Sequence, residues 1–380
     1  MELVIDGKTI IARNGMTVLE AARAVGIYIP SLCYHPAISP SGTCRLCAVE
    51  VKGMRGLPCS CTLPATEGMV VNTDTPRVRE FRRTQLECIL SEHPQDCLVC
   101  PANLRCELQE VAAHIGLEQV RLPLVPPSSY VKKEEDIFFN RDYSRCIRCG
   151  RCVRVCHELR GNKAIYFLFD EKGLSIGTPL NRSLEHSGCK FCGACVDICP
   201  TGALLDRAQK GLPEQVTTTI CPYCGVGCQL KLQVRSGKIT QVVPDPDGPA
   251  NHGQACVKGR FGIAEFVHHS DRLTHPLIRR NGTLVEVDWD EALNVVANTL
   301  AQYSSGQVAV ISSAKCTNED NYVAQKFARV VLRTNNIDHC ARLCHAPTVA
   351  GLAQSFGSGA MTNSIAEIGE AACILAIGTN

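Results

Sequence analysis

The hydrophobic and polar positions of the first 26 residues predict a β-hairpin followed by a helix. Two short apolar runs, residues 3–5 and 9–11, flank the turn sequence DGK, which is typical of a tight hairpin connection. Thr17 can cap the helix, Glu20 completes a capping box, and Gly26 occupies the position just after the helix end.

The later pattern predicts a second hairpin and then an α/β segment. Residues 229–234 and 238–243 read as two strands that turn at an SG pair. Beyond about residue 268, a buried strand at 307–313, a helix at 318–333 and a strand at 372–377 alternate, as in α/β domains. No apolar run approaches the ~20 residues that a helix needs to cross a bilayer.

Composition narrows the class of protein. At 380 residues the chain should form several domains. Its formal charge of +2 gives no strong field for nucleic acid or membrane surfaces, so neither is expected as a partner. The 25 cysteines decide the rest. Because the start lacks an export signal, so many cysteines indicate a cytoplasmic, metal-binding protein and not a disulfide scaffold.

One cysteine pattern occurs twice between residues 146 and 199, in the spacing C-x2-C-x2-C-x3-C. This is the run of bacterial [4Fe–4S] ferredoxins, in which the fourth cysteine reaches across to the other cluster. Tight turns should leave backbone N–H groups pointing at the sulfurs. A zinc site needs fewer cysteines, and a disulfide net does not demand this spacing twice. The predicted ligand sets are Cys146, Cys149, Cys152 with Cys199, and Cys189, Cys192, Cys195 with Cys156.

A cysteine-bearing loop follows the first predicted helix. Its spacing, C-x10-C-x2-C and then a fourth cysteine, resembles the loop of plant-type and hydrogenase-type [2Fe–2S] domains of β-grasp fold. Cys59 and Cys61 both lie where the last ligand belongs; the string CTLPATEGM at 61–69 resembles the closing segment of that family and favours Cys61. Buried structural cysteines are the alternative. The resemblance implies the ligands Cys33, Cys44, Cys47 and Cys61.

The next motif combines one histidine with three cysteines: His93, Cys97, Cys100 and Cys106. A neutral imidazole can replace one thiolate on iron and should raise the cluster potential; a Cys3His zinc site is the alternative. The strings HPQDCLVC at 93–100 and CELQ at 106–109 are similar to the His-ligated [4Fe–4S] domain of iron hydrogenases and of the large iron–sulfur subunit of respiratory complex I.

A linker rich in proline and charge is expected at residues 119–136. Six arginines then crowd the first ferredoxin motif. They are expected either to make a positive environment for the cluster or a partner, or to form a solvated face that neutralises the cluster's charge. These arginines are Arg141, Arg145, Arg148, Arg151, Arg154 and Arg160.

At residue 221 the spacing changes to C-x2-C-x3-C, with a distant fourth cysteine. The strings CPYCGVGC at 221–228 and CVKG at 256–259 closely resemble the [4Fe–4S] domain of molybdenum or tungsten bis-pterin oxidoreductases. In that family the lysine after the last cysteine helps to pass electrons between cluster and pterin, a role that the resemblance gives to Lys258. The implied cluster ligands are Cys221, Cys224, Cys228 and Cys256.

Two cysteines and two histidines lie within seven residues of the string TNNIDHCARLCH at 334–345. The residues alone are compatible with a metal site or a structural loop. The string is similar to the active-site segment of formate dehydrogenases, which implies Cys344 as a ligand of molybdenum or tungsten and His345 as the proton-handling or substrate-orienting group. Cys340 would be a bystander. The final GTN resembles a turn that touches the pterin nucleotide, which implicates Gly378 and Asn380.

The resemblance covers the whole chain and implies an α+β multidomain protein. In order, the expected domains are a β-grasp [2Fe–2S] domain at 1–78, a His-ligated [4Fe–4S] domain at 79–118, a double [4Fe–4S] ferredoxin at 137–210, a [4Fe–4S] domain of bis-pterin type at 214–270, and an incomplete α/β molybdopterin domain at 271–380.

This order resembles the catalytic subunit of cytosolic, NAD-linked or hydrogenase-linked formate dehydrogenases. It implies formate and CO2 as substrate and product, and one [2Fe–2S] cluster, four [4Fe–4S] clusters and a molybdenum or tungsten bis-molybdopterin guanine dinucleotide as cofactors. An NADH-oxidising flavoprotein or a hydrogenase-type subunit is the expected partner. The alternatives are a complex I large subunit and a non-catalytic electron-transfer module. Because members of that family are longer, we expect a fragment that holds the metal cofactor incompletely.

Overall fold

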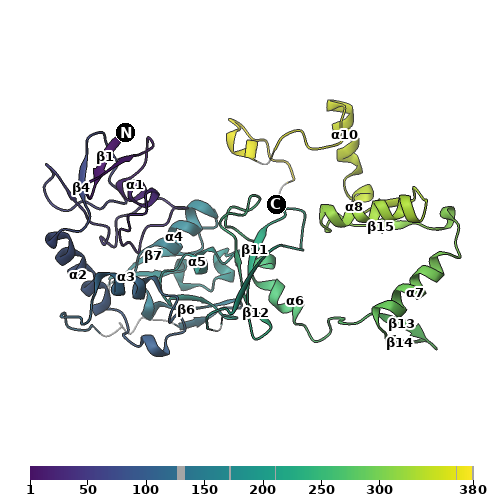
Figure 1. The fold of residues 1–380 in the computed structure, drawn as a ribbon, viewed down its shortest axis with the longest axis horizontal. Helices are drawn as coiled ribbons and strands as arrows, with labels where there is room; N and C mark the ends of the chain where they lie inside the picture. The colour runs from purple at the N-terminus through teal and green to yellow at the C-terminus, as the bar shows by residue number, and fades with distance from the viewer. Residues whose placement is uncertain (126–132, 171–172, 210, 365, 379–380) are drawn as a thin grey trace. The chain divides into compact units, whose positions relative to one another are not determined.

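A computed structural model describes residues 1–125, 133–170, 173–209, 211–364 and 366–378. The chain falls into two units (Figure 1). The first contains residues 1–220 and 228–270, and the second contains residues 221–227 and 271–380. Helices and strands are mixed throughout, as the sequence predicts.

The N-terminal module is a four-stranded sheet covered by one helix. Strands β1 (Glu2–Ile5) and β2 (Lys8–Ile11) form the predicted hairpin, and the sheet order is β2-β1-β4-β3, with β1 and β4 parallel. The capping box of Thr17 and Glu20 is present and begins α1. The apolar face of α1 is buried against the sheet. The remaining elements are α1 (Val18–Ala24), β3 (Glu50–Val51) and β4 (Val70–Asn72).

Two helices and a 3-10 turn carry the histidine motif. Thr75 caps α2 (Pro76–Ser91), and Gly116 ends α3 (Glu107–Ile115) in a left-handed conformation. Between the helices lies the turn Cys97–Val99. The buried side chains of both helices form one apolar cluster with the loops that carry Cys33, Cys44 and Cys149, so this module packs against both of its neighbours in the first unit.

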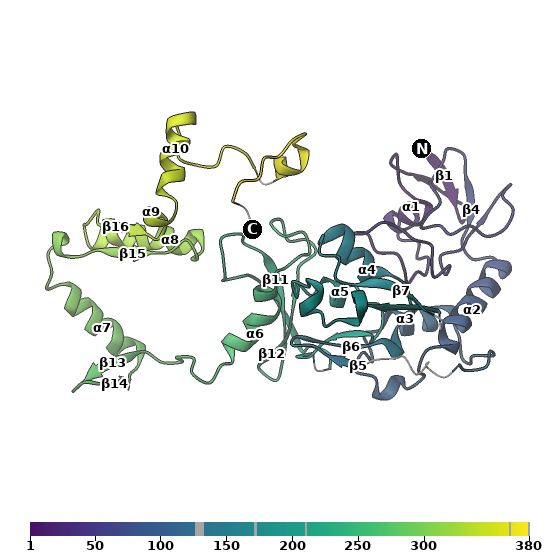
Figure 2. The same ribbon diagram turned by 180° about the vertical axis from the view of Figure 1, so that it is seen from behind.

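The double ferredoxin module contains two short helices that lie side by side (Figure 1, Figure 2). A three-stranded sheet of order β5-β6-β9 and a β7–β8 hairpin complete it. The first strand lies inside the expected linker, and residues 126–132 of that linker lie outside the described residues. The elements are β5 (Lys133–Glu135), β6 (Phe139–Asp142), α4 (Arg151–Arg154), a π-helical turn (Val155–Leu159), β7 (Tyr166–Asp170), β8 (Gly173–Gly177), α5 (Ala194–Asp197) and β9 (Leu204–Asp206).

The fourth module is built on the second predicted hairpin. Strands β11 (Gln229–Arg235) and β12 (Lys238–Pro244) turn at Ser236 and Gly237, both in the left-handed region. The sequence analysis missed a third strand, β10 (Gln215–Ile220), which pairs with β11. The π-helical turn Lys258–Gly262 and α6 (Ile263–Val267) follow.

The second unit alternates strands and helices, but two strand predictions need correction. The strand expected at 307–313 is reduced to β15 (Val310–Ser312), and it is not buried, since Ile311 is 86% exposed. The strand expected at 372–377 does not form, because these residues pair with no strand among the described residues. The helix predicted at 318–333 is present as α8 (Asn318–Lys326) and a π-helical turn (Phe327–Val331).

The other elements of this unit surround the CARLCH segment in the sequence. Strands β15 and β16 pair in parallel, and α9 follows β16 directly. The elements are β13 (Leu277–Arg280), β14 (Thr283–Glu286), α7 (Trp289–Leu300), β16 (Ile337–His339), α9 (Ala341–Cys344), α10 (Ala346–Phe356) and a 3-10 turn (Ala366–Glu370).

Candidate metal centres

Each crossed cysteine set of the double ferredoxin module lines its own cavity. One cavity, of about 340 Å³, is bounded by Cys146, Cys149, Cys152 and Cys199. The other, of about 320 Å³, is bounded by Cys156, Cys189, Cys192 and Cys195. The chain therefore brings the fourth cysteine of each motif to the cavity of the other motif, and the near equality of the volumes suits two clusters of one kind.

Backbone N–H groups point at the sulfurs in both motifs, as predicted. The N–H of Arg148 donates to Cys146 Sγ at 3.4 Å, and the N–H of Phe191 donates to Cys189 Sγ at 3.3 Å. Both donors occupy the same position in the repeat and have positive φ, 54° and 49°. A third N–H, that of Ala164, donates to Cys156 Sγ at 3.3 Å. These donors would stabilise the negative charge of sulfur ligands.

Burial makes these thiols poor acids without a bound cation. It raises the pKa of Cys146 and of Cys149 to about 12, and it raises the pKa of Cys152 and Cys195 well above the usual range. A coordinating metal ion deprotonates a thiol outright. The donor set therefore fits a cationic iron–sulfur core, which would supply the charge that buried thiolates need.

Five cysteines of the N-terminal module meet in one buried pocket. The side chain of Cys61 hydrogen-bonds to both Cys33 and Cys47, whereas Cys59 reaches only Cys47 among these two. Hydrogen bonds from Cys59 and then Cys61 lower the pKa of Cys47 to about 3. The remaining member, Cys44, hydrogen-bonds to Cys33 and accepts the N–H of Leu32 at 3.3 Å. Contact with two other ligands supports Cys61 over Cys59 as the fourth [2Fe–2S] ligand.

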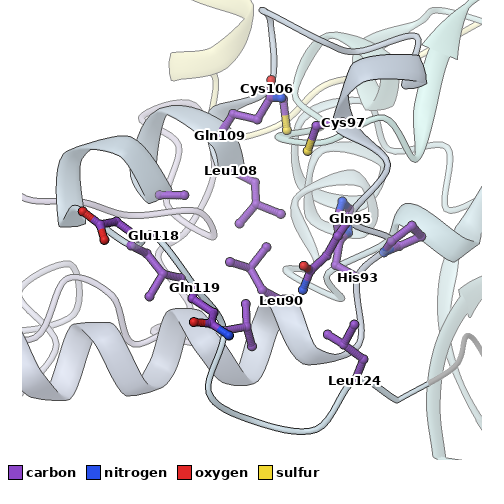
Figure 3. Close-up of a pocket in the computed structure, with 14 residues that line it drawn as sticks. Leu90, His93, Gln95, Cys97, Cys106, Leu108, Gln109, Glu118, Gln119 and Leu124 are labelled. Atoms are coloured by element: carbon purple, nitrogen blue, oxygen red, sulfur yellow. The ribbon is translucent and has the colours of Figure 1, made fainter.

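The histidine motif surrounds a cavity next to α2 and α3. His93, Cys97 and Cys106 line it, and Figure 3 shows the sulfur atoms of Cys97 and Cys106 facing each other. Burial, then the charge of Arg145, lowers the pKa of His93 to about 4, so the imidazole is neutral near pH 7. Its Nδ1 is buried without a hydrogen-bond partner among the described residues. A neutral, unsatisfied imidazole nitrogen suits a metal ligand.

Cys100 is placed differently from the other two cysteines of this motif. A Cβ added at Gly202 would lie 3.2 Å from Cys100 Sγ, which puts this thiol beside the segment that follows Cys199. The charges of Cys100 and Cys97 both act on the pKa of Cys106, which burial raises. The three thiols are thus grouped, while the charges that act on the pKa of His93 belong to arginine and aspartate side chains and not to these cysteines. A mixed His–Cys ligand set stays a prediction.

Among the described residues, no group of three or more His, Cys, Asp or Glu side chains is arranged to hold a single metal ion. An iron–sulfur cluster is a larger group that thiolates hold at its periphery.

The arginines of the first ferredoxin motif have a role that the sequence analysis missed. Neither expected role, a positive environment nor a solvated face, describes them; they bind groups of the neighbouring modules. Arg145 forms a bidentate pair with Asp96 at 2.7 Å, and Arg151, which is buried, forms one with Glu107 at 2.7 and 2.9 Å. Arg160 donates to Gln254 Oε1 at 2.6 Å. Arginine can do this because its planar fork binds two acceptors at once.

Arg260 completes these links from the fourth module, and no sequence motif pointed to it. It is 1% exposed and pairs with Asp197 and Asp206, each at 2.7 Å. Such a buried pair tolerates the loss of neither partner, since an unpaired buried charge costs about 3–5 kcal/mol. The four modules of the first unit are therefore joined by charged side chains as well as by apolar packing.

The predicted ligands of the fourth cluster are divided between the two units. Cys221 and Cys224 belong to the second unit, and Cys228 and Cys256 belong to the first. Lys258 is exposed and begins the π-helical turn after Cys256. This ligand set and the role of Lys258 stay predictions.

Cys344 and His345 lie at the junction of α9 and α10. Both are exposed, and His345 Nδ1 is 3.2 Å from the carbonyl oxygen of Ala341. Cys340, one turn earlier, is also exposed. Gly378 has φ 61°, and Asn380 lies outside the described residues. An exposed thiol is the soft donor that a molybdenum or tungsten centre with sulfur ligands accepts, so Cys344 fits the predicted role chemically.

Five family models match successive parts of the chain. They describe a 2Fe-2S iron-sulfur cluster binding domain (residues 1–76), the NADH-ubiquinone oxidoreductase-G iron-sulfur binding region (82–121), the ferredoxin-like domain of NADH-quinone oxidoreductase subunit 3 (138–205), the molybdopterin oxidoreductase Fe4S4 domain (214–269) and molybdopterin oxidoreductase itself (272–380). By its domains, the chain is a molybdopterin oxidoreductase with iron–sulfur domains. The order of the domains is the order that the sequence predicts.

Curated relatives of this molybdopterin oxidoreductase match along its whole length. They include the alpha subunit of an NADPH-Fe(3+) oxidoreductase of Geobacter sulfurreducens, 35% identical, and an NADH-quinone oxidoreductase of Rhizobium meliloti, whose second G-type chain is 36% identical. A protein of Staphylococcus aureus named "Putative formate dehydrogenase" is 32% identical. The chain spans 43–44% of the length of these relatives.

A solved structure is similar to part of the chain. It is an NAD+-reducing [NiFe]-hydrogenase in the H2-reduced state, with a TM-score of 0.50 and 31% sequence identity. The match covers 55% of this chain and 88% of the hydrogenase chain. Across the part of the molybdopterin oxidoreductase chain that the structure describes, no helix combines the length and apolar character of a membrane span.

Proposed function

We propose that this chain is the iron–sulfur and metal-ligating portion of a formate dehydrogenase catalytic subunit, which oxidises formate to CO2 or runs the reverse reaction. The observation that carries the proposal is the pair Cys344 and His345 between α9 and α10, inside the segment that matches molybdopterin oxidoreductase. The Staphylococcus aureus relative named for formate dehydrogenase supports it.

The residues divide the work by their chemistry. When bound, a molybdenum or tungsten bis-pterin centre would take two electrons from formate. Cys344 would hold that metal through its thiolate, and His345 would orient formate or accept a proton. Lys258 would lie between pterin and cluster, Gly378 and Asn380 would contact the pterin nucleotide, and the cysteine sets of the first unit would hold the clusters that carry electrons to a flavoprotein or hydrogenase-type subunit.

A formate-reduction assay tests the proposal. In the protein purified anaerobically with its natural partners, formate should bleach the iron–sulfur absorbance and drive dye reduction. Cys344→Ala should lower the rate by about 100-fold or more, since it removes a metal ligand. Cys340→Ala is the matched control, because it removes an exposed thiol one turn away on the same segment and should leave the rate near wild type. No formate-dependent bleaching in the wild-type protein would reject formate as the substrate.

The second candidate is an electron-transfer subunit that serves NADH or NADPH and does not act on formate. Two relatives named for NADPH-Fe(3+) and NADH-quinone oxidoreductases favour it, as do the matches of residues 82–205 to NADH-quinone oxidoreductase domains. In the same assay, bleaching by NADH or NADPH but not by formate would favour this candidate, and Cys344→Ala would then have no effect.

A further inference from the structure

We propose that Arg154 is a positioning residue that couples the [2Fe–2S] site of the N-terminal module to the neighbouring [4Fe–4S] site of Cys146, Cys149, Cys152 and Cys199. The proposal rests on the iron–sulfur part of the proposed function. Arg154 Nη2 donates to the carbonyl oxygen of Cys33 at 2.5 Å and to that of Cys149 at 3.3 Å. One guanidinium nitrogen therefore contacts a ligand residue of each predicted cluster.

The loop that follows Cys33 is held at a second point. Arg154 Nη1 donates to the carbonyl oxygen of Ser39, and the N–H of Ser39 donates to Glu158 Oε2 at 2.7 Å. Arg154 and Glu158 are one helical turn apart, so a single turn of the ferredoxin module binds both polar groups of Ser39. This double attachment fixes the [2Fe–2S] loop against the segment that carries Cys149.

The charge of Arg154 is available to the clusters because of what it contacts. Its neighbour Arg151 is paired with Glu107, whereas the guanidinium of Arg154 donates to backbone carbonyls of described residues. Burial, and next the charge of Arg151, lowers the pKa of His35, two residues after Cys33, and the charge of Arg154 acts in the same direction. The field of this guanidinium thus reaches the [2Fe–2S] loop.

The two cysteines also lie within electrostatic reach of each other. Burial raises the pKa of Cys149 to about 12, and the charge of Cys33 acts in the same direction. Reduction of either predicted cluster adds one electron and one negative charge, and transfer between them moves one electron without making or breaking a bond. A half-buried cation between the two ligand residues would stabilise the added charge and raise both potentials.

The test uses two substitutions that separate charge from geometry. Arg154→Gln removes the charge and most of the donors, while Arg154→Lys keeps the charge but cannot span three carbonyls with a planar fork. Potentiometric titration followed by EPR on the full chain with assembled clusters reports each potential and the magnetic interaction between the two reduced clusters. We expect Arg154→Gln to lower both potentials and weaken the interaction, and Arg154→Lys to weaken the interaction with smaller potential shifts.

Arg160→Gln is the matched control. It removes an arginine of the same motif that binds Gln254 and Ala255, and it should leave both potentials and their interaction at wild-type values. Unchanged potentials and interaction in Arg154→Gln, with both clusters assembled, would overturn the proposal while leaving the proposed function intact. If that variant does not assemble the [2Fe–2S] cluster, an unchanged interaction in Arg154→Lys overturns it. Absence of both cluster signals from the wild-type chain would instead reject the iron–sulfur function itself.

Discussion

At the scale of single residues, the choice between Cys59 and Cys61 shows what spacing can and cannot decide. Both thiols are buried and close to Cys47, so spacing alone leaves two candidates. The structure adds the contact of Cys61 with Cys33, which Cys59 does not share. Because a ligand of a two-iron cluster must face the other ligands across the cluster, this second contact distinguishes the two cysteines.

Substitution of each cysteine by serine tests this distinction. Cys61→Ser should abolish the [2Fe–2S] EPR signal or change its g-values, since an oxygen donor replaces a soft thiolate. Cys59→Ser should keep the signal, because it removes only a hydrogen bond between side chains. EPR of the dithionite-reduced full chain measures both. The reverse result, with the signal lost in Cys59→Ser and kept in Cys61→Ser, would assign the ligand to Cys59.

At the scale of elements, the structure followed the sequence wherever the signal was local. The first hairpin, the capped helix at Thr17 and the SG turn all formed as predicted, because turn and cap chemistry acts within a few residues. The strand expected at 372–377 failed, because a strand also needs a partner, and that depends on residues far away in the sequence. The arginine partners Asp96 and Glu107 were missed for the same reason, since they lie more than 40 residues from the motif.

Two glycines of the second ferredoxin motif separate backbone strain from packing. Gly188 and Gly193 have nearly equal positive φ, 74° and 76°. A Cβ at Gly188 would meet nothing within 4 Å, whereas one at Gly193 would lie 3.0 Å from Arg260 Cγ and 3.1 Å from Phe261 Cζ. Arg260 cannot move aside cheaply, because Asp197 and Asp206 hold it.

We therefore expect Gly193→Ala to cost more stability than Gly188→Ala. The shared left-handed conformation should cost about 1–3 kcal/mol in each variant, and overpacking should add about 1–3 kcal/mol at Gly193 alone. Urea denaturation of the cluster-loaded chain, followed by circular dichroism, compares the two midpoints. Equal midpoints would mean that the contact between Gly193 and Arg260 does not hold the fourth module in place.

At the scale of the whole molecule, most of the candidate sites were readable from the sequence, because cysteine spacing encodes how a loop wraps a cluster. Spacing could not supply the relations between sites. The contact of Arg154 with Cys33 and Cys149, and the 3.6 Å approach of Cys106 Sγ to the carbonyl oxygen of Pro200, depend on how separate modules pack. These relations, and not the ligand sets, are what the three-dimensional structure adds to the function.

The crossed ligand sets make a prediction about the iron content of the whole chain. Five fully assembled clusters hold about 18 iron atoms. The double variant Cys146→Ser with Cys199→Ser removes two ligands of one cavity, so it should lose one cluster and retain about 14 iron atoms. Cys146→Ser with Cys156→Ser removes one ligand from each of two cavities, so it should lose two clusters and retain about 10. If each motif held its own cluster, the order of the two iron contents would be reversed, and zinc in place of iron would reject the cluster assignment altogether.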